Sequence, residues 1–323
     1  MDPRNNFNTF YPGLSWSDTE GRPIQAHGGG MLYTGGVYYW YGENKDSETY
    51  KVSEITAWEC WRNDVTGISC YSSSDLVHWK NEGIVLEAVG DDPSHDLHIL
   101  KVVERPKVIY NEKTKKYVMW MHIDTMHYDY AAVGVAISDN PEGPFTYLRS
   151  FRPNNCDSRD MTVFKDADGE AYLFYSSEMN KTMHITPLSE DYLGVGDYFS
   201  RVFVGQFREA PAVFKHKMKY YMITSGCTGW EANEAQYAVA DHIYGPWTVK
   251  GNPCVGHDSD KTFYAQGTFV FPVIGKMNAC IFMADLWKKR ILRDSKYIWL
   301  PIRFNGDAIS VEWMEKWNLL AFK

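Results

Sequence analysis

Residues 30–43 read GMLYTGGVYYWYGE, two short apolar runs on either side of a Thr-Gly-Gly turn. Aromatic and β-branched residues favour pleated strands, and glycine allows the tight reversal between them. The stretch therefore predicts a β-hairpin. Four further stretches repeat this order of short strand, turn and aromatic or β-branched strand; they cover residues 107–122, 161–177, 212–225 and 268–284.

A second pattern follows three of these hairpins. Residues 68–79, 133–145 and 237–247 each contain a strand, then a turn with Asp, then an aromatic residue. Five units of four short strands predict an all-β fold, a five-bladed β-propeller. The repeats are longer and less regular than WD40 repeats and lack the Gly-His and Trp-Asp signature.

We expect residues 1–323 to form a single propeller, because no low-complexity linker interrupts the chain. Either residues 310–314 or the N-terminal stretch completes the fifth blade, and the sequence leaves both open.

The composition supports a β fold, with 22 Tyr, 16 Phe and 12 Trp against 15 Leu. The formal net charge of −8 argues against a nucleic-acid partner, since an acidic surface repels phosphate. No apolar run is long enough to span a bilayer. Six cysteines without a Cys-x-x-Cys motif allow up to three disulfides but assign none. We expect a monomer.

Polar residues recur at one position of the repeat. Innermost strands of a propeller face the central channel, so residues just before equivalent inner strands should converge. That position holds Glu104, Asp160, Glu209 and Gln266, from four blades. One such acid would be an ordinary strand-end residue on a solvated rim, but the repetition favours an axial pocket.

Clustered carboxylates in an aromatic pocket suit glycoside hydrolysis. One protonated acid donates to the leaving oxygen, and a second group activates water or attacks the sugar. Burial and a neighbouring like charge raise the pKa of one acid and keep it protonated near neutral pH. These residue types alone do not say which acid has which role.

At these residues the chain resembles glycoside hydrolase family 43, and more closely its exo-β-1,3-galactanase branch. The similar stretches run from about residue 25 to residue 270 and so cover all five predicted blades. They read QAHGGG (25–30), YYWYGE (38–43), YSSSDLVHW (71–79), ERPKVIYN (104–111), SRDM (158–161), REAP (208–211), TSGCTGW (224–230) and QGT (266–268).

The resemblance implies an inverting exo-glycosidase that releases galactose from the non-reducing end of β-1,3-galactan, the arabinogalactan backbone. An exo-acting enzyme needs a pocket closed at one end. By position, Glu209 matches the general acid and Glu104 a second active-site glutamate. Asp160 matches the acid that binds substrate and tunes the general acid.

The chain departs from the wider family on the first blade. Typical members carry an aspartate there as general base, whereas this chain has His27, Gly28 and Gly29. The galactanase branch shares this gap, and a glutamine on the fifth blade, here Gln266, is thought to act instead. An amide oxygen has almost no proton affinity at pH 7. We expect Gln266 to orient the attacking water or act as an imidic-acid tautomer, with Glu104 as the rival base.

The branch also suggests residues that contact the sugar. Trp230 follows the fourth hairpin and could stack on the apolar face of galactose, although a core tryptophan is the alternative. Tyr128 matches a sugar-contacting tyrosine, with a buried rim tyrosine as the alternative. Strand-end residues such as Glu43 could bind hydroxyls or lie in solvated loops. The substrate-binding candidates are Asp160, Trp230, Thr228, Gly229, Tyr128, Glu43 and Asn180.

Residues 95–98 (HDLH) and 122–124 (HID) resemble metal-ligand pairs. Zinc needs three or four convergent ligands, and no third ligand lies in register. We therefore expect no cofactor, while a structural Ca²⁺ near the axis stays open, because some relatives of the family hold one.

Two rival functions stay open. One is a different specificity on the same fold, β-xylosidase or α-L-arabinofuranosidase. The other is a non-catalytic carbohydrate-binding propeller, suggested by the missing first-blade aspartate. Because the implied substrate is a polymer, we expect a secreted or periplasmic protein with its signal peptide removed, with the cytoplasm as the alternative.

Overall fold

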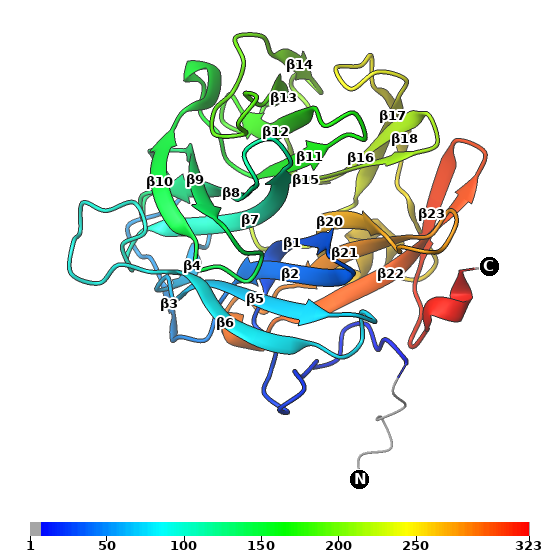
Figure 1. Ribbon diagram of the computed structural model, residues 1–323, viewed down its shortest axis with the longest axis horizontal. Coiled ribbons are helices and arrows are strands. Elements are labelled where there is room, and N and C mark those ends of the chain that lie inside the picture. Colours follow the sequence, from blue (N-terminus) through cyan, green and yellow to red (C-terminus); the bar gives the residue numbers. More distant parts are fainter. Residues whose placement is uncertain (1–7, 323) are drawn as a thin grey trace.

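The computed structural model describes residues 8–322, which form five β-sheets around a central axis (Figure 1). Each of the first four sheets has four antiparallel strands in chain order from the centre outward. The first holds β1 (His27–Thr34), β2 (Val37–Glu43), β5 (Gly67–Ser73) and β6 (Lys80–Glu87). The second holds β7 (Val102–Asn111), β8 (Lys116–Asp124), β9 (Ala132–Ser138) and β10 (Thr146–Phe151).

The third sheet holds β11 (Met161–Lys165), β12 (Ala171–Ser177), β13 (Thr182–Pro187) and β14 (Ser200–Val202). The fourth holds β15 (Arg208–His216), β16 (Lys219–Gly226), β17 (Gln236–Ala240) and β18 (Thr248–Gly251). The fifth holds β20 (Gln266–Pro272), β21 (Cys280–Leu286), β22 (Lys296–Asn305) and β23 (Ala308–Glu312), with β19 (Cys254–Val255) parallel to β23 at its outer edge. Outside the blades, β3 (Thr49–Lys51) and β4 (Trp61–Asn63) form a small hairpin. Short 3₁₀ helices cover Pro153–Asn155, Ser259–Tyr264, Leu292–Asp294 and Leu319–Ala321.

The predicted five-bladed β-propeller is therefore confirmed. The innermost strands β1, β7, β11, β15 and β20 contact one another in turn and close the ring. The fifth blade is completed by β23, the first of the two alternatives that the sequence allowed. Among the described residues, the N-terminal stretch adds no strand to this sheet: Phe10 forms an isolated bridge with Trp317, and the N–H of Gly13 donates to the carbonyl of Tyr297 at 2.8 Å.

Aromatic residues fill the space between blades, as their number suggested. Trp40 of the first blade lies with its ring 4.7 Å from Trp299 of the fifth blade and 5.5 Å from Trp79. All three are almost fully buried. Large aromatic side chains at such a junction each contribute several kcal/mol, on the order of 3 to 5, to stability.

The six cysteines lie within the described residues and are all free. Within residues 8–322, no helix has the length and apolar character needed to cross a membrane.

The inner strands are irregular where they enter the channel. The pairing register shifts after His27 in β1, after Glu104 in β7 and after Glu209 in β15. The next residue of each has a positive φ: +59° at position 28, +57° at Arg105 and +51° at Ala210. A bulge of this kind bends the strand and re-aims its side chains. Two of the four polar residues of the register, Glu104 and Glu209, thus directly precede such a distortion.

Gly29 offers a test of how closely the first two strands approach. A Cβ atom at this position would lie 1.8 Å from the carbonyl oxygen of Tyr41 in β2, so the strands would have to separate. Gly29→Ala should therefore lower the free energy of unfolding by about 2 kcal/mol or more, measured by denaturant titration. Gly90→Ala is the matched control, because nothing lies within 4 Å of its Cβ position. Equal stability of the two variants would contradict this account.

Candidate active site

A cavity of about 390 Å³ opens at the end of the channel where the inner strands begin. The structure brings most of the predicted site residues to its wall: Glu43, Glu104, Tyr128, Asp160, Asn180, Glu209, Gly229, Trp230 and Gln266. Thr228 does not line the cavity. Its hydroxyl donates to the carbonyl of Glu231 at 2.5 Å and accepts from Asn233 Nδ2 at 2.7 Å, so it holds the loop that carries Trp230.

Arg105 lies at the centre of the site, and only 8% of its side chain is exposed. Its Nη2 atom donates to Gln266 Oε1 at 2.5 Å and lies 2.9 Å from Asp160 Oδ2, while Nη1 donates to the carbonyl of Gly267 at 3.2 Å. Its backbone N–H donates to Glu43 Oε1 at 3.0 Å. One residue of the second blade thus links the first, third and fifth blades.

The guanidinium also fixes the orientation of Gln266. A guanidinium can only donate, so the amide oxygen faces Arg105 and the amide nitrogen faces away. That nitrogen donates to Glu209 Oε1 at 3.0 Å and to Ser225 Oγ at 3.1 Å. A cation on the amide oxygen opposes protonation there, which disfavours the imidic-acid role. The oxygen keeps a second lone pair that can accept a hydrogen bond from water.

Glu209 is the carboxyl that stays protonated. Burial and the nearby negative charge of Asp160 raise its pKa to about 8, and Arg105 only partly opposes them. Asp160 is held close, because the N–H of Ala210 donates to its Oδ2 at 3.0 Å. At neutral pH, Glu209 can therefore donate a proton.

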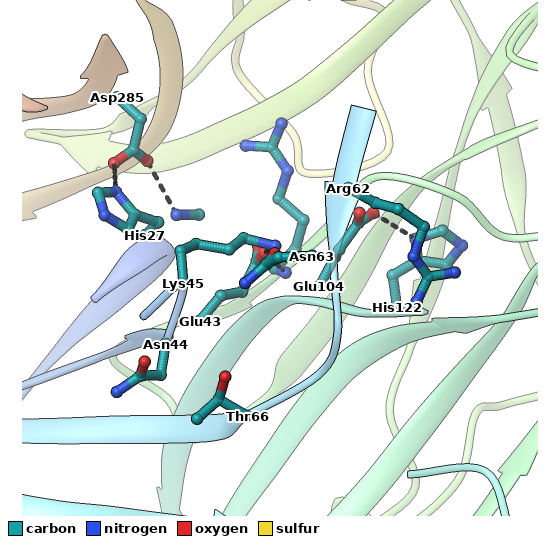
Figure 2. A network of polar contacts seen from close by, with 12 residues as sticks. His27, Glu43, Asn44, Lys45, Arg62, Asn63, Thr66, Glu104, His122 and Asp285 are labelled. Atoms are coloured by element: carbon teal, nitrogen blue, oxygen red, sulfur yellow. Dashed lines mark hydrogen bonds and ion pairs between the residues drawn. The ribbon is translucent and has the colours of Figure 1, made fainter. Parts of the chain in front are cut away.

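Glu104 is in the opposite state. Burial alone would raise its pKa, but the hydrogen bond and positive charge of His122 outweigh burial and, with Lys45 and Tyr128, lower the pKa to about 2. His122 Nδ1 lies 3.3 Å from Glu104 Oε2, and the Tyr128 hydroxyl donates to Oε1 at 3.0 Å. Figure 2 shows Glu104 and His122 facing each other.

His122 itself is held between two carboxylates. Its Nε2 lies 3.2 Å from Asp124 Oδ2. Burial lowers the pKa of His122, but the hydrogen bonds to Asp124 and Glu104 outweigh it and raise the pKa to about 9. The sequence suggested residues 122–124 as a metal-ligand pair. Instead, the positively charged His122 lies between the carboxylates of Asp124 and Glu104 and contacts both.

The first blade has a buried histidine where the wider family has its base. His27 Nδ1 lies 3.0 Å from Asp285 Oδ1, and the N–H of Gly28 donates to Asp285 Oδ2 at 2.8 Å (Figure 2). The Tyr297 hydroxyl lies 3.3 Å from His27 Nε2. Both His27 and Asp285 are almost fully buried and neither lines the cavity, so this pair supports the blade.

Glu43 lines the cavity, but both of its oxygens already have partners. Oε1 accepts from the backbone of Arg105, and Oε2 lies 2.6 Å from Lys45 Nζ (Figure 2). A sugar hydroxyl would have to share them. Asn180 differs, since its Oδ1 has no hydrogen-bond partner in the described part of the chain.

Aromatic side chains surround the mouth of the cavity. Trp230 lies with its ring 5.8 Å from that of Trp287 at a steep angle, and Tyr128 lies 5.7 Å from Trp58. Trp58 and Trp287 were not among the sequence candidates. Both lie outside the similar stretches, one in the segment between β2 and β5 and the other just after β21.

Sequence reasoning also missed Arg105 and His122 as parts of the site, and Asp285 as the support of His27 behind it. Arg105 was within reach, because it lies directly between Glu104 and the rest of the similar stretch. Asp285 pairs with Gln266 across β20 and β21, which only the strand register reveals.

The described residues contain no group of three or more His, Cys, Asp and Glu side chains placed to hold a metal ion. In the loop at residues 95–98, His95 Nδ1 accepts from the N–H of Leu97 at 3.0 Å, and His98 Nδ1 accepts from the N–H of Leu100 at 3.3 Å. These two histidines stabilise turns.

Residues 28–270 match the model of the family described as Glycosyl hydrolases family 43. A solved GH43 β-1,3-galactosidase is 39% identical to this chain, with a TM-score of 0.89. The match covers 98% of this chain and 64% of the galactosidase chain. The exo-β-1,3-galactanase from Phanerochaete chrysosporium, solved with β-1,3-galactotriose, is 35% identical to this chain, with a TM-score of 0.86. That match covers 97% of this chain and 68% of the galactanase chain.

A curated relative, described as a β-xylosidase from Xylanibacter ruminicola, is 32% identical over 171 residues, which is 40% of this chain and 52% of that protein. The chain thus spans about half the length of this curated relative and under two thirds of the β-1,3-galactosidase structure.

The ion pair between His122 and Glu104 can be tested directly. His122→Gln should raise the pKa of Glu104 above about 2, because the imidazolium that stabilises the carboxylate is gone. We expect a rise of at least about one pH unit in a carbon-13 titration of the glutamate carboxyls. His184→Gln is the matched control. His184 is also buried, and its Nε2 lies 3.2 Å from Glu178 Oε1, but neither residue lines the cavity. An unchanged Glu104 titration in His122→Gln would refute the assignment.

Proposed function

The chain belongs to Glycosyl hydrolases family 43, and on that premise we propose that it removes galactose from the non-reducing end of β-1,3-galactan with inversion at the anomeric carbon. The observation that carries the proposal is the pair of opposed carboxyls in one cavity, Glu209 protonated and Glu104 ionised. A buried carboxyl that stays protonated beside an ionised one is the arrangement expected of a general acid. Similarity to a β-1,3-galactosidase and an exo-β-1,3-galactanase over nearly the whole chain supports the substrate.

Glu209 is the proposed general acid. Its proton moves to the glycosidic oxygen as the bond from that oxygen to C1 breaks, and the shortened chain leaves with a new hydroxyl. Water adds to C1 from the opposite face, so the released galactose has the inverted configuration. The oxygen of the water becomes the C1 hydroxyl and one proton of that water passes to solvent, while Glu209 takes one proton back from solvent, so no net proton is consumed.

Gln266 is the proposed positioning residue for that water. Arg105 occupies one lone pair of Oε1 and Glu209 accepts from the amide nitrogen, so the amide is held in one orientation beside the acid. The second lone pair of Oε1 can accept from the water. Glu104 remains the rival base. It is a weak one, because His122 and Tyr128 already stabilise its carboxylate.

A second candidate is β-xylosidase activity, favoured by the relative of that description. The two differ in the sugar that the pocket accepts, since xylose lacks the C6 hydroxymethyl group. Thin-layer analysis of products from β-1,3-galacto-oligosaccharides, aryl β-xylosides and aryl α-L-arabinosides separates these functions. A polymeric substrate also motivates our proposal of an extracytoplasmic location.

Glu209→Gln tests the general acid. It should lower kcat for β-1,3-galactobiose about a thousandfold, but slow an aryl β-galactoside much less, because that leaving group needs little protonation. In the wild type, kcat/KM should fall as pH rises past about 8, where Glu209 ionises. This alkaline limb should vanish for the aryl substrate in the variant. Exposed Glu234, outside the cavity, supplies the control Glu234→Gln. Equal losses on both substrates would exclude Glu209 as the acid.

Gln266→Ala tests the water-positioning role. We expect kcat to fall about a hundredfold, since the water loses its fixed acceptor, with little change in KM. The residual product should still be the inverted anomer, observed by proton NMR immediately after release. Full activity in Gln266→Ala together with loss of activity in Glu104→Gln would transfer the role to Glu104.

A further inference from the structure

One segment of the first blade reaches over the cavity. It runs from residue 44 to residue 66 between β2 and β5, contains the β3–β4 hairpin and places Trp58 in the cavity wall. The Trp58 ring lies 5.7 Å from Tyr128 of the second blade. It also meets Gly229 of the fourth blade, where a Cβ atom would lie 3.7 Å from the Trp58 ring. Trp58 thus bridges two blades that are not neighbours.

The wall continues from Trp58 around the fourth and fifth blades. Gly229 adjoins Trp230, and the Trp230 ring lies 5.8 Å from that of Trp287. All three tryptophans are half-buried and line the cavity. Three wide, rigid rings from three separate loops therefore enclose one side of the site.

Lys289 ties these loops together. Its Nζ atom lies 2.9 Å from Glu59 Oε2, next to Trp58, and 2.7 Å from Glu231 Oε1, next to Trp230. A further hydrogen bond joins the same parts, from the N–H of Leu292 to Thr49 Oγ1 at 2.9 Å. The Lys289 side chain is 28% exposed, and its partners Glu59 and Glu231 are 46% and 75% exposed, so both ion pairs lie at the surface and are sensitive to salt.

The wall of the cavity on the third blade is different. Its residues there are Arg159, Asp160 and Asn180, without an aromatic side chain. This blade is also next to the acid, because Asp160 binds the backbone beside Glu209. The leaving part of a substrate lies at the acid. On the side of the fourth and fifth blades the cavity wall carries Trp230 and Trp287, so the third blade is the side of the acid on which a leaving chain meets no aromatic wall. The terminal sugar then lies between the acid and the wall formed by Trp58, Trp230 and Trp287, which we call the tryptophan wall.

We propose that Trp58, fastened by Lys289, is the end wall that stops a galactan chain after its terminal galactose and so makes cleavage exo-acting. This inference rests on the proposed function and adds the residue that sets the position of cleavage. A chain continuing beyond the terminal O3 would have to pass through the Trp58 ring or displace the segment that carries it.

Two matched substrates test the wall. One is β-1,3-galactohexaose, and the other is the same oligosaccharide with a 3-O-methyl group on its non-reducing terminal galactose. The wild type should cleave the first and be at least about a hundredfold slower on the blocked chain, since a closed pocket has no room beyond O3. Trp58→Ala should raise the ratio of blocked to free rates at least about tenfold and release the methylated sugar or longer fragments.

Lys289→Met provides a second variant that keeps Trp58 in place. Loosening the segment should raise the same ratio about threefold, and high salt should bring the wild type closer to the variant by screening the pairs. Lys288→Met is the control. Lys288 lies beside Lys289 in the sequence but pairs with Asp294. The ratio of blocked to free rates in Lys288→Met should therefore equal that of the wild type.

Two results would overturn the inference. One is rapid cleavage of the blocked chain by the wild type. The other is an unchanged ratio in Trp58→Ala and Lys289→Met. If Trp58→Ala fails to fold, judged by its thermal unfolding, the ratio in Lys289→Met decides. A wild type that cleaves neither galactan substrate but releases xylose would instead reject the proposed function, and the galactan end wall with it.

Discussion

The buried guanidinium of Arg105 is the interaction on which the rest of the site depends. Its charge is compensated by Asp160, and its N–H groups hold Gln266, Gly267 and Glu43 from other blades. A buried ion without its partners costs several kcal/mol, so the blades can meet here only with these groups in place. Beneath it Lys107 Nζ donates to the carbonyl of Gly28 at 2.9 Å, and burial, with the charge of Arg105, lowers the Lys107 pKa to about 7.

The same axis creates two different proton environments. Asp160 accepts from Arg105 and from the backbone beside Glu209, so its negative charge acts on a buried carboxyl whose pKa Arg105 lowers only in part. Glu104 instead faces the His122 imidazolium, which Asp124 stabilises from behind. Burial pushes the pKa of both glutamates upward; the charge of Asp160 raises the pKa of Glu209 further, whereas the hydrogen bond and charge of His122 lower that of Glu104. The proton states of the two glutamates therefore follow from the charged side chain beside each, Asp160 beside Glu209 and His122 beside Glu104.

Local patterns were enough to predict the five hairpins, because each strand pair is formed by residues close in sequence, as in β1 and β2. The polar register was predicted because it repeats. The bulges were not, since a positive φ at Arg105 or Ala210 is unusual for residues with side chains and depends on the assembled ring. The His27–Asp285 pair joins residues 258 positions apart, and no local pattern indicates it.

Specificity lies where the chain departs from its repeat. Five similar blades place inner strands symmetrically around the axis, and symmetry alone would leave a channel mouth open in every direction. The segment at residues 44–66 breaks that symmetry by laying Trp58 between Tyr128 and Gly229, and the third blade has no such insertion among its cavity residues. The wall is assembled from three loops through Lys289, so no single blade determines it. A change in this wall can therefore alter where a chain is cut without moving Glu209 or Gln266, which belong to the inner strands β15 and β20.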